Sequence, residues 1–394
     1  MPELTQKIKE YGAKYQQYLI DTRRYFHQHP EPSLQETETA KKIKEELESF
    51  GIPCHFAGTP CHNGVVGTIE GGKPGRTIML RADIDALKIQ EETDCSFSSL
   101  NPGVMHACGH DCHIALLLTA ARILTDIREE LCGSVRLVFQ PAEEFGVGAG
   151  MLIADGVLDG VDACYGSHVW SSLPSGTIAV ASGPVMAAGS RFEVFVKGKG
   201  AHGAEPHKGV DPLLTTAAIA MNLQSIVSRE IDTQAPSVLS IGRMQSGSQY
   251  NAIPAEGYLE GTTRTFSPEV DLAWADMIRR VVENTAEAYR AEAELVYHYI
   301  LGPVLNDAAL AELVRESVRK VGGPELLGAM KPTTTSEDFS EYQKLIPGVL
   351  AFIGVGSEAC GAVYPQHSNH YKVDESALLN GALLYAQVAA DYLR

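Results

Sequence analysis

The segment 105–113 constrains the fold most, because nine residues hold three histidines, two cysteines and one aspartate. Imidazole, thiolate and carboxylate groups are the side chains that bind divalent transition metals. The apolar run 114–124 predicts a buried helix, so the ligand-rich segment lies in the turn that opens it, where Gly109 allows a tight backbone. A helix start with ordinary polar residues is the plainer alternative, but the Cys-x-His-Asp-x-His pattern favours a metal site.

Three predicted strands carry similar side chains at or just after their ends. These strands and side chains are 77–83 with Asp83, 134–140 with Glu143 and Glu144 shortly after it, and 163–167 with His168. Mainly apolar runs that end in charge or imidazole are typical of buried central strands. Open α/β sheets place their active sites at the carboxyl ends of strands, so we expect these groups to converge on one site.

Strands that alternate with helices predict an α/β fold with a central, mostly parallel sheet. Residues 64–70 and 77–83 also suggest a hairpin. Near Gly183 the pattern changes to strand–helix–strand–strand–helix–strand, the ferredoxin-like order. We therefore expect a first domain formed by 1–182 and 299–394, with 183–298 inserted as an α+β ferredoxin-like domain.

Length and charge exclude several classes of protein. A chain of 394 residues predicts more than one domain. The net charge of −17, from 32 basic and 49 acidic residues, argues against nucleic acid or an anionic membrane as partner. The chain has no apolar run long enough to span a bilayer, and its eight scattered cysteines favour a reducing cytoplasm over a disulfide framework.

Further candidate residues lie in loops and at strand ends. Glu143 and Glu144 could divide metal binding and proton transfer between them, although a solvated pair capping a helix would look the same. Arg264 ends a predicted strand, where it could bind a substrate carboxylate or be an ordinary surface charge. The other candidates are His202 in the glycine-rich loop 198–207, Asn251 in a turn, and the competing pair His367 and His370.

These motifs together resemble the aminoacylase–carboxypeptidase family of metallohydrolases, in the amidohydrolase branch that holds hippurate hydrolases, bacterial N-acyl-amino-acid deacylases and plant auxin-conjugate hydrolases. The similarity covers nearly the whole chain. It rests on residues 23–31, 81–87, 105–113, 140–144, 200–202 with 206–207, 250–254, 336–339, and 367–368 with 374–375.

The resemblance implies a phosphorylase/hydrolase-like catalytic domain and a lid that carries the contact of a homodimer or dimer-based tetramer. It implies two divalent ions per subunit, Zn²⁺ or Mn²⁺ with Co²⁺ or Ni²⁺ as alternatives, and a small N-acyl amino acid as substrate. The implied metal ligands are Cys108, His110, Glu144, His168 and His367. The other implied roles are Glu143 as general base, His202 at the oxyanion, often across a dimer interface, Asn251 and Arg264 at the substrate carboxylate, and Asp83 as support for the ligands.

The chain departs from this branch at a few positions. Lys88 stands where proline is usual, Ser167 replaces a common methionine, and His370 with Tyr371 follows a motif that often continues differently. These positions bear on the acyl pocket more than on catalysis. A dipeptidase or carboxypeptidase on the same scaffold is the close alternative. A non-catalytic metal-dependent binding protein is the distant one, since binding alone does not need Glu143.

Overall fold

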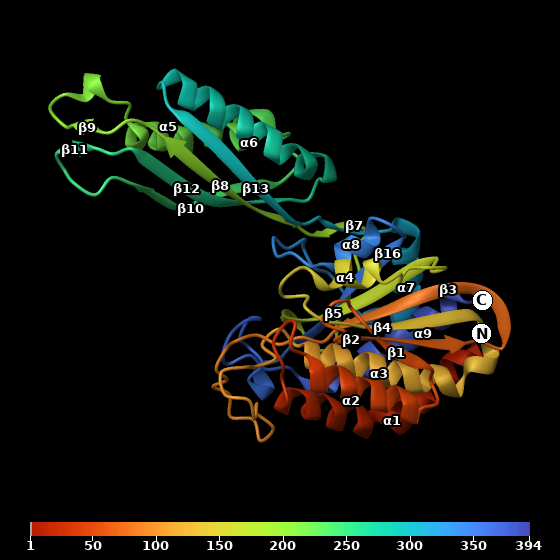
Figure 1. Cartoon of the computed structure of the whole chain (residues 1–394). Coiled ribbons are helices and arrows are strands. Elements are labelled where there is room, and N and C mark those ends of the chain that lie inside the picture. The colour runs from red at the N-terminus through yellow and green to blue at the C-terminus, as the bar shows by residue number, and fades with distance from the viewer. Residues whose placement is uncertain (1) are drawn as a thin grey trace. The chain divides into compact units, whose positions relative to one another are not determined.

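The computed structural model describes residues 2–394, and its contacts divide them into two compact units (Figure 1). The first unit comprises the chain up to Gly183, Leu305–Lys331 and Asp338–Arg394. The second comprises Pro184–Val304 and Pro332–Glu337, so the chain returns briefly to the second unit late in the sequence.

The first unit is built on an eight-stranded sheet, whose four central strands run parallel to one another. In spatial order the strands are β1 (Cys54–Ala57), β2 (Gly64–Glu70), β4 (Cys132–Gln140), β3 (Lys73–Asp83), β5 (Ala163–Pro174), β16 (Gly348–Gly356), β6 (Ile178–Ala179) and β15 (Leu327–Gly328). Parallel strands buried on both faces need largely apolar runs, and β16 is apolar throughout. β5 is equally buried over residues 163–169, although Ser167 and His168 interrupt its apolar run. The predicted α/β fold with a mostly parallel central sheet is confirmed.

Helices cover this sheet. They are α1 (Pro2–Gln28), α2 (Thr37–Ser49), α3 (His110–Asp126), α4 (Gly148–Ala154), α7 (Ala308–Gly322), α8 (Phe339–Gln343) and α9 (Leu378–Tyr392). Helix α3 is apolar on almost every side because it is buried between α1, α9 and the sheet (Figure 1). Within residues 2–394, every helix is too short or too polar to cross a lipid bilayer.

The predicted hairpin of the second and third strands is wrong. β2 and β3 are not neighbours, because β4 lies between them and pairs antiparallel with β2 and parallel with β3. The Gly71–Gly72 link packs directly on the start of β4: the Gly71 amide donates to the Gly133 carbonyl at 2.8 Å. A Cβ at Gly71 would lie only 2.5 Å from that oxygen, so glycine there admits β4 between the two strands.

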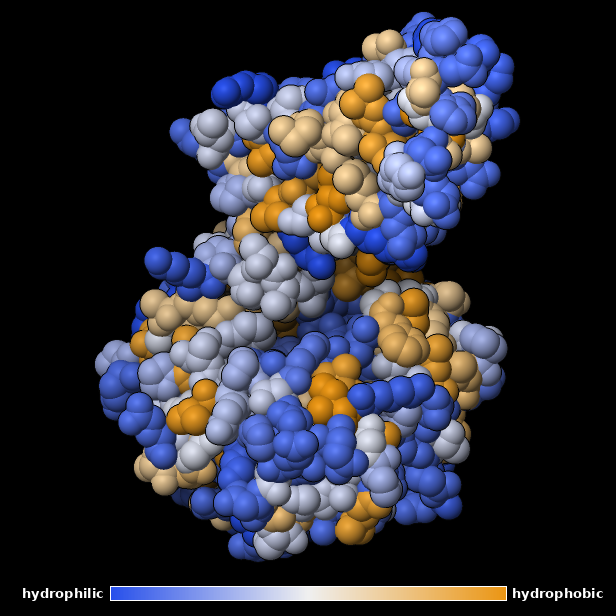
Figure 2. All heavy atoms as spheres, turned by 90° about the vertical axis from the view of Figure 1, so that its left-hand side faces the viewer, coloured by the Kyte–Doolittle hydropathy of each residue, from blue (hydrophilic) through white to orange (hydrophobic). Residues whose placement is uncertain are grey.

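The second unit follows the strand–helix–strand–strand–helix–strand order. Its elements are β8 (Ala188–Lys197), α5 (Pro212–Ser225), β10 (Ser237–Ser246), β12 (Glu256–Thr265), α6 (Pro268–Ala288) and β13 (Glu292–Leu301). The strands form an antiparallel sheet in the order β10-β12-β8-β13, with a core that includes Phe192, Leu259 and Trp274. Apolar side chains remain on the outside of this unit, and Figure 2 draws such residues in orange.

Two further sheets have two strands each. β7 (Gly183–Met186) pairs with β14 (Val304–Asn306), at two of the four points where the chain passes between the units. β9 (Ala201–His202) pairs antiparallel with β11 (Ala252–Ile253) in the second unit. The β9–β11 ribbon therefore brings the predicted residues of the 198–207 loop next to the turn that holds Asn251.

Candidate metal centre

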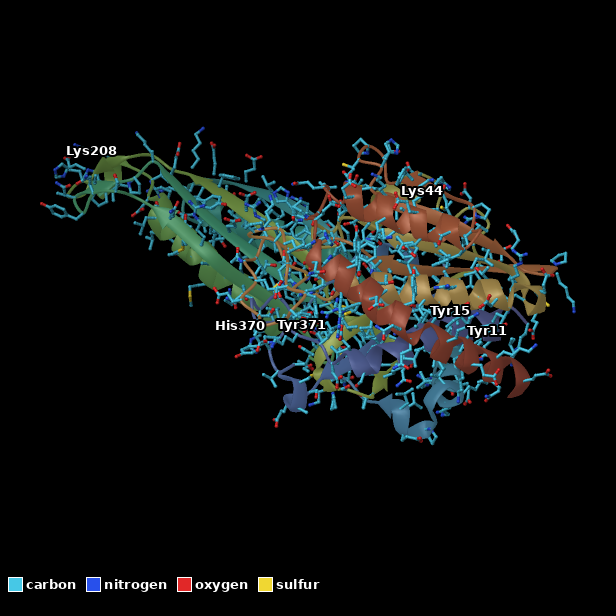
Figure 3. All side chains as sticks on the ribbon, turned by 90° about the horizontal axis from the view of Figure 1, so that it is seen from below. Tyr11, Tyr15, Lys44, Lys208, His370 and Tyr371 are labelled. Atoms are coloured by element: carbon cyan, nitrogen blue, oxygen red, sulfur yellow. The ribbon has the colours of Figure 1, made fainter. Side chains whose placement is uncertain are left out.

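The turn before α3 positions the first two predicted ligands, Cys108 and His110. Gly109 caps the helix with a φ of 93°, a left-handed conformation that favours glycine. A Cβ at Gly109 would lie 2.4 Å from a methyl group of Val169 and 2.9 Å from the hydroxyl of Tyr371, which Figure 3 labels. Glycine is therefore required both for the turn and for its close packing on β5.

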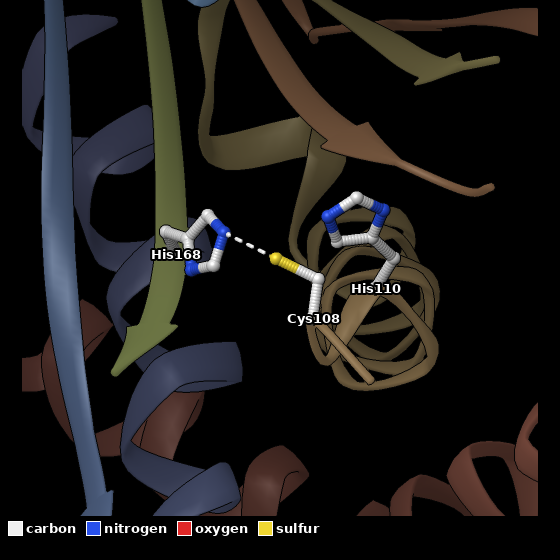
Figure 4. Close-up of side chains that lie close together, drawn as sticks. All are labelled: Cys108, His110 and His168. Atoms are coloured by element: carbon white, nitrogen blue, oxygen red, sulfur yellow. Dashed lines mark hydrogen bonds between the residues drawn. The ribbon is translucent and has the colours of Figure 1, made fainter. Parts of the chain in front are cut away.

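Cys108, His110 and His168 form the first ligand group, in which one ligand atom from each residue lies within 4.8 Å of the others. The Cys108 thiol faces His168 Nε2 at 3.5 Å across the gap between α3 and β5 (Figure 4). His168 Nδ1 donates to the Val169 carbonyl at 2.7 Å. Because that bond fixes the proton on Nδ1, the lone pair of Nε2 points toward Cys108.

Cys108 also belongs to a second group, with Glu144 and His367. His367 Nε2 lies 3.4 Å from Glu144 Oε1. The amide of His367 donates to the Ala107 carbonyl at 2.8 Å, which holds this residue beside the turn although its φ of 65° is unusual for histidine. All five predicted ligands thus fall into two groups that share one thiol, an arrangement suited to two cations.

Two buried atoms in this cluster have no hydrogen-bond partner among residues 2–394: His110 Nε2 and Glu144 Oε1. They lie 3.9 Å apart. The other ring nitrogen of His110, Nδ1, donates to the Asp85 carbonyl at 2.9 Å, so in the neutral ring the lone pair lies on Nε2. Orphaned buried acceptors cost free energy, so the residues present fit a bound cation.

The electrostatics of the cluster also favour a cation. Burial and the nearby carboxylates of Glu144, Glu143 and Asp83 raise the pKa of the Cys108 thiol well above its ordinary value. Burial disfavours a charged His110 ring, but Asp83 and Asp85 outweigh that effect and raise the pKa of His110 to about 10. A divalent ion would replace both protons and balance the carboxylates.

Glu143 lies directly beside the ligands, and its carboxylate oxygen Oε2 is 3.9 Å from His110 Nε2. The preceding residue, Ala142, has a φ of 53°, an unusual backbone for alanine, and its amide donates to Glu36 at 2.8 Å. This bend after β4 turns Glu143 and Glu144 toward the same group of ligand atoms, together with His110. Glu143 is only 8% exposed, so it is a buried carboxylate beside the candidate ligand atoms.

No role was predicted for Asp85 from the sequence, but the structure places it beside the candidate ligands His110 and Glu144. Asp85 accepts the backbone amide of Glu144 at 3.1 Å and the hydroxyl of Ser33 at 2.7 Å, besides its contact with His110. It lies two residues after Asp83, so the alternation along an extended chain could have indicated that both face the same side. Asp83 itself contacts His113 and Arg81, and its Oδ2 is 3.8 Å from His110 Nε2.

The structure separates the two late histidines. His367 lies in the ligand cluster, whereas His370 lies against Glu92, with Nδ1 donating to the Glu92 carbonyl at 2.9 Å and Nε2 at 3.5 Å from its carboxylate. Of the two, only His367 has a position from which it can bind a cation held by Cys108.

The remaining predicted residues, His202, Asn251 and Arg264, lie in the second unit. His202 pairs with Ala252 across the β9–β11 ribbon, and the Gly203 amide donates to the Asn251 carbonyl at 2.8 Å. His202 and Asn251 are therefore neighbours, and both are exposed.

Arg264 of β12 is a half-buried cation without a carboxylate neighbour among residues 2–394, and burial lowers its pKa. Its Nη1 donates to Thr262 Oγ1 at 2.5 Å and to the Thr263 carbonyl at 2.8 Å. The Thr262 hydroxyl donates to the Ser190 carbonyl at 2.7 Å, so it can only accept from Arg264. The Nη1 group is thereby anchored, while Nε and Nη2 have no hydrogen-bond partner among residues 2–394.

The turn before α3, the segment after β4, strand β5 and a late loop bring thiol, imidazole and carboxylate side chains together beside a further buried carboxylate. This arrangement defines a metal-dependent hydrolase. The comparison with known families agrees with this class. The model of peptidase family M20/M25/M40 matches residues 79–391, and the chain belongs to this family.

The similar proteins include enzymes named for different activities, among them a deacetylase and a carboxypeptidase. N-acetylcysteine deacetylase of Bacillus subtilis is 40% identical over 377 residues, covering 94% of this chain and 96% of that protein. Thermostable carboxypeptidase 1 of Saccharolobus solfataricus is 37% identical over 392 residues, covering 99% of each. The solved structure of the Bacillus subtilis YXEP protein, described as a dinuclear metal-binding peptidase, is 37% identical with a TM-score of 0.86, covering 97% of this chain and 99% of that one. The chain is accordingly a hydrolase of this family, whose relatives act on amide bonds.

Proposed function

We propose that this protein hydrolyses the amide bond of N-acyl amino acids, of the acetyl or benzoyl type, to a carboxylic acid and a free amino acid. The observation that carries the proposal is the position of Glu143, a buried carboxylate beside two ligand groups that share Cys108. The deacetylase relative supports this substrate class.

The cofactors that we propose are two divalent cations, held by Cys108, His110, Glu144, His168 and His367. A thiolate ligand favours Zn²⁺, and the carboxylate and imidazole ligands also suit Mn²⁺, Co²⁺ or Ni²⁺. When bound, such ions lower the pKa of water toward neutrality and polarise a carbonyl group.

The protein groups supply proton transfer and orientation. Glu143 takes the proton from the attacking water and delivers it to the leaving amine, as a general base and then a general acid. His202 donates a hydrogen bond to the oxyanion that develops on the amide carbonyl, an interaction often worth about 3 kcal/mol. Both roles follow from the family resemblance. The buried position of Glu143 and the exposed ring of His202 are compatible with them.

Arg264 and Asn251 bind the carboxylate of the substrate in this proposal. The guanidinium of Arg264 is anchored on one side and has no carboxylate neighbour among the described residues, so a ligand carboxylate can supply the missing charge. The same clamp would suit a dipeptide or a peptide C-terminus. The carboxypeptidase relative favours that second candidate, a dipeptidase or carboxypeptidase on the same scaffold.

We further propose that the second unit forms a homodimer or a dimer-based tetramer. Helix α5 buries Ile219 and Leu223 yet also exposes Leu213, Leu214 and Met221. A helix that is apolar on opposite faces is usually covered on both. Strand β10 is an edge of the sheet, so its outer backbone groups are free to pair with a second chain. All eight cysteines are free, which suits a reducing compartment, and we propose the cytoplasm.

A substrate screen tests the proposed function. Metal-free protein reconstituted with Zn²⁺ or Mn²⁺ is assayed by released amine on N-acetyl amino acids, N-benzoyl amino acids and dipeptides. We expect turnover of the N-acyl amino acids to exceed that of the dipeptides. The reverse order would favour the peptidase alternative, and metal binding without turnover of any substrate would indicate a binding protein.

A further inference from the structure

His113 is a fully buried histidine in the ligand-rich segment that the proposed function does not use. It lies on the first turns of α3, with its ring 5.4 Å from that of His110 and 4.6 Å from that of His168, measured between ring centres. With Asp83 and His110 it also forms a group that could hold an ion by distance alone. The hydrogen bonds of His113 show whether it can bind a metal ion itself or can only hold the neighbouring ligands in place.

Both ring nitrogens of His113 are occupied. The backbone amide of Val169 donates to Nε2 at 2.9 Å. A backbone N–H can only donate, so Nε2 must be the acceptor and the proton must lie on Nδ1. Nδ1 then donates to the carboxylate of Asp83 in a short hydrogen bond. The ring has no lone pair left for a cation, which excludes it as a ligand in this arrangement.

Asp83 is itself held in place by a buried cation. Arg81 Nη1 donates to Asp83 Oδ2 at 2.6 Å, while its Nη2 donates to Asp338 at 2.9 Å and its Nε to Gln140 at 2.9 Å. Arg81 is 1% exposed, so these groups form a fixed base beneath the ligand cluster. The guanidinium thereby fixes the carboxylate of Asp83, whose other oxygen accepts the hydrogen bond from His113 Nδ1.

On its other side, His113 is hydrogen-bonded to the segment of β5 that carries the proposed ligand His168. Val169 directly follows the proposed ligand His168, and the Val169 carbonyl accepts both from His168 Nδ1 at 2.7 Å and from Gln366 Nε2 at 3.0 Å. The peptide groups of Val169 are thus fixed on both sides, by His113 at the amide and by His168 and Gln366 at the carbonyl. The hydrogen bond from the Val169 amide can form only when His113 carries its proton on Nδ1 and not on Nε2.

We propose that His113 is a positioning residue that holds His168 where it can share a cation with Cys108, through the hydrogen bond from the Val169 amide. This inference rests on the proposed metal centre and assigns no contact between His113 and substrate. It requires an acceptor at the place of His113 Nε2, not an imidazole as such.

Two variants separate these requirements. His113→Gln places an amide oxygen near the position of Nε2 and can still accept from Val169. His113→Asn can reach Asp83 but is too short to reach Val169. We expect His113→Asn to bind Zn²⁺ about 10- to 100-fold more weakly in a chelator competition, the usual cost of losing a group that orients a metal ligand. His113→Gln should stay within about threefold of the wild type. The absorption spectrum of bound Co²⁺ should change in His113→Asn only.

Three outcomes would overturn the inference. Equal Zn²⁺ affinity in His113→Asn and wild type would show that the Val169 contact does not position His168. Equal losses in both variants would show that the acceptor is not what matters. A wild type that binds one more ion than either variant would make His113 a ligand. Thermal unfolding of the metal-free proteins shows whether each variant folds, and His113→Gln alone still tests the claim if His113→Asn does not. A wild type without bound ions would instead contradict the proposed function.

Discussion

At the scale of single residues, Glu143 and Glu144 differ in which candidate ligands lie next to their carboxylates. Both follow β4 and share a group with His110, but Glu144 also groups with Cys108 and His367, whereas Glu143 also groups with Glu337 and Asp338. Glu144 Oε1 is an orphaned buried acceptor, as a metal ligand would be in the absence of an ion. Adjacent carboxylates of the same chemistry can therefore take different roles, one binding and one transferring protons.

We predict that Glu143→Gln keeps its metal content and loses turnover. The amide is nearly the same size as the carboxylate but cannot accept a proton, and general acid–base catalysis contributes about 10²- to 10⁴-fold. Metal analysis and steady-state kinetics of the reconstituted variant measure both properties. Glu144→Gln is the matched control, which should lose metal. Full activity in Glu143→Gln would defeat the assignment.

For Arg264→Ala we predict a larger loss of kcat/KM on free-acid substrates than on their amides, by about 10- to 100-fold, since a hydrogen bond to a charged group is worth about 1.5–3 kcal/mol. Thr262→Val should reproduce part of this selective loss, because it removes an anchor of the guanidinium. Arg243→Ala, an exposed arginine of β10, is the control. Equal losses on acids and amides would count against a carboxylate clamp.

Among the elements, α1 fixes the start of α3 and with it two of the proposed ligands. Arg23 and His27 are four residues apart on α1 and therefore share a face. Arg23 Nε lies 2.7 Å from Asp111 Oδ2 and His27 Nδ1 lies 2.9 Å from the same oxygen, one residue beyond His110. His27 Nε2 reaches Glu91 at 3.2 Å, which ties the loop after β3 to this pair of helices.

The Glu91 contact predicts an acid-sensitive contribution to stability. Burial opposes its ionised form, but hydrogen bonds from His27, the Ser99 amide and Thr93 outweigh burial and lower the pKa of Glu91 to about 2. A lowered folded-state pKa stabilises the fold above the unfolded value of 4.5, and the contribution is lost as the pH falls from there through about 2. Glu91→Gln should therefore destabilise the protein at neutral pH by about 1.5–3 kcal/mol.

Urea unfolding of metal-free wild type and Glu91→Gln at a series of pH values measures this window. We expect the difference in unfolding free energy to shrink as the pH falls below about 4.5. The exposed Glu38→Gln serves as control, since the Glu38 side chain is 73% exposed. A difference that stays constant over the acid range would show that the ionised carboxylate is not responsible.

For the whole molecule, the proposed homodimer predicts a concentration-dependent assembly through the second unit. The double variant Leu214→Asp, Met221→Asp places charge on two side chains that are 53% and 74% exposed, so the monomer should tolerate it. We expect the double variant to sediment as a monomer in a sedimentation velocity experiment, because burying a charge without a partner opposes association. Leu272→Asp, at 78% exposure on α6, is the matched control. If only the Leu272→Asp control lost the dimer, the interface would lie on the face that carries Leu272 and not on α5.

The sequence by itself determined the α/β class, the strand–helix–strand–strand–helix–strand order of the second unit, and the family. It also named the side chains that the structure gathers into two ligand groups. These properties are readable because periodicity, helix breakers and ligand chemistry are local: α1 ends before Pro30, and β3 is apolar until Asp83.

Only the tertiary structure decided which distant groups meet. It placed β4 between β2 and β3, made Cys108 common to both ligand groups, separated His367 from His370, and gave Asp85 and His113 their partners. It also showed a half-buried Arg264 without a carboxylate neighbour among residues 2–394. Such facts depend on distances between side chains far apart in the chain, and on which lone pairs remain after every hydrogen bond is made, neither of which a local pattern contains.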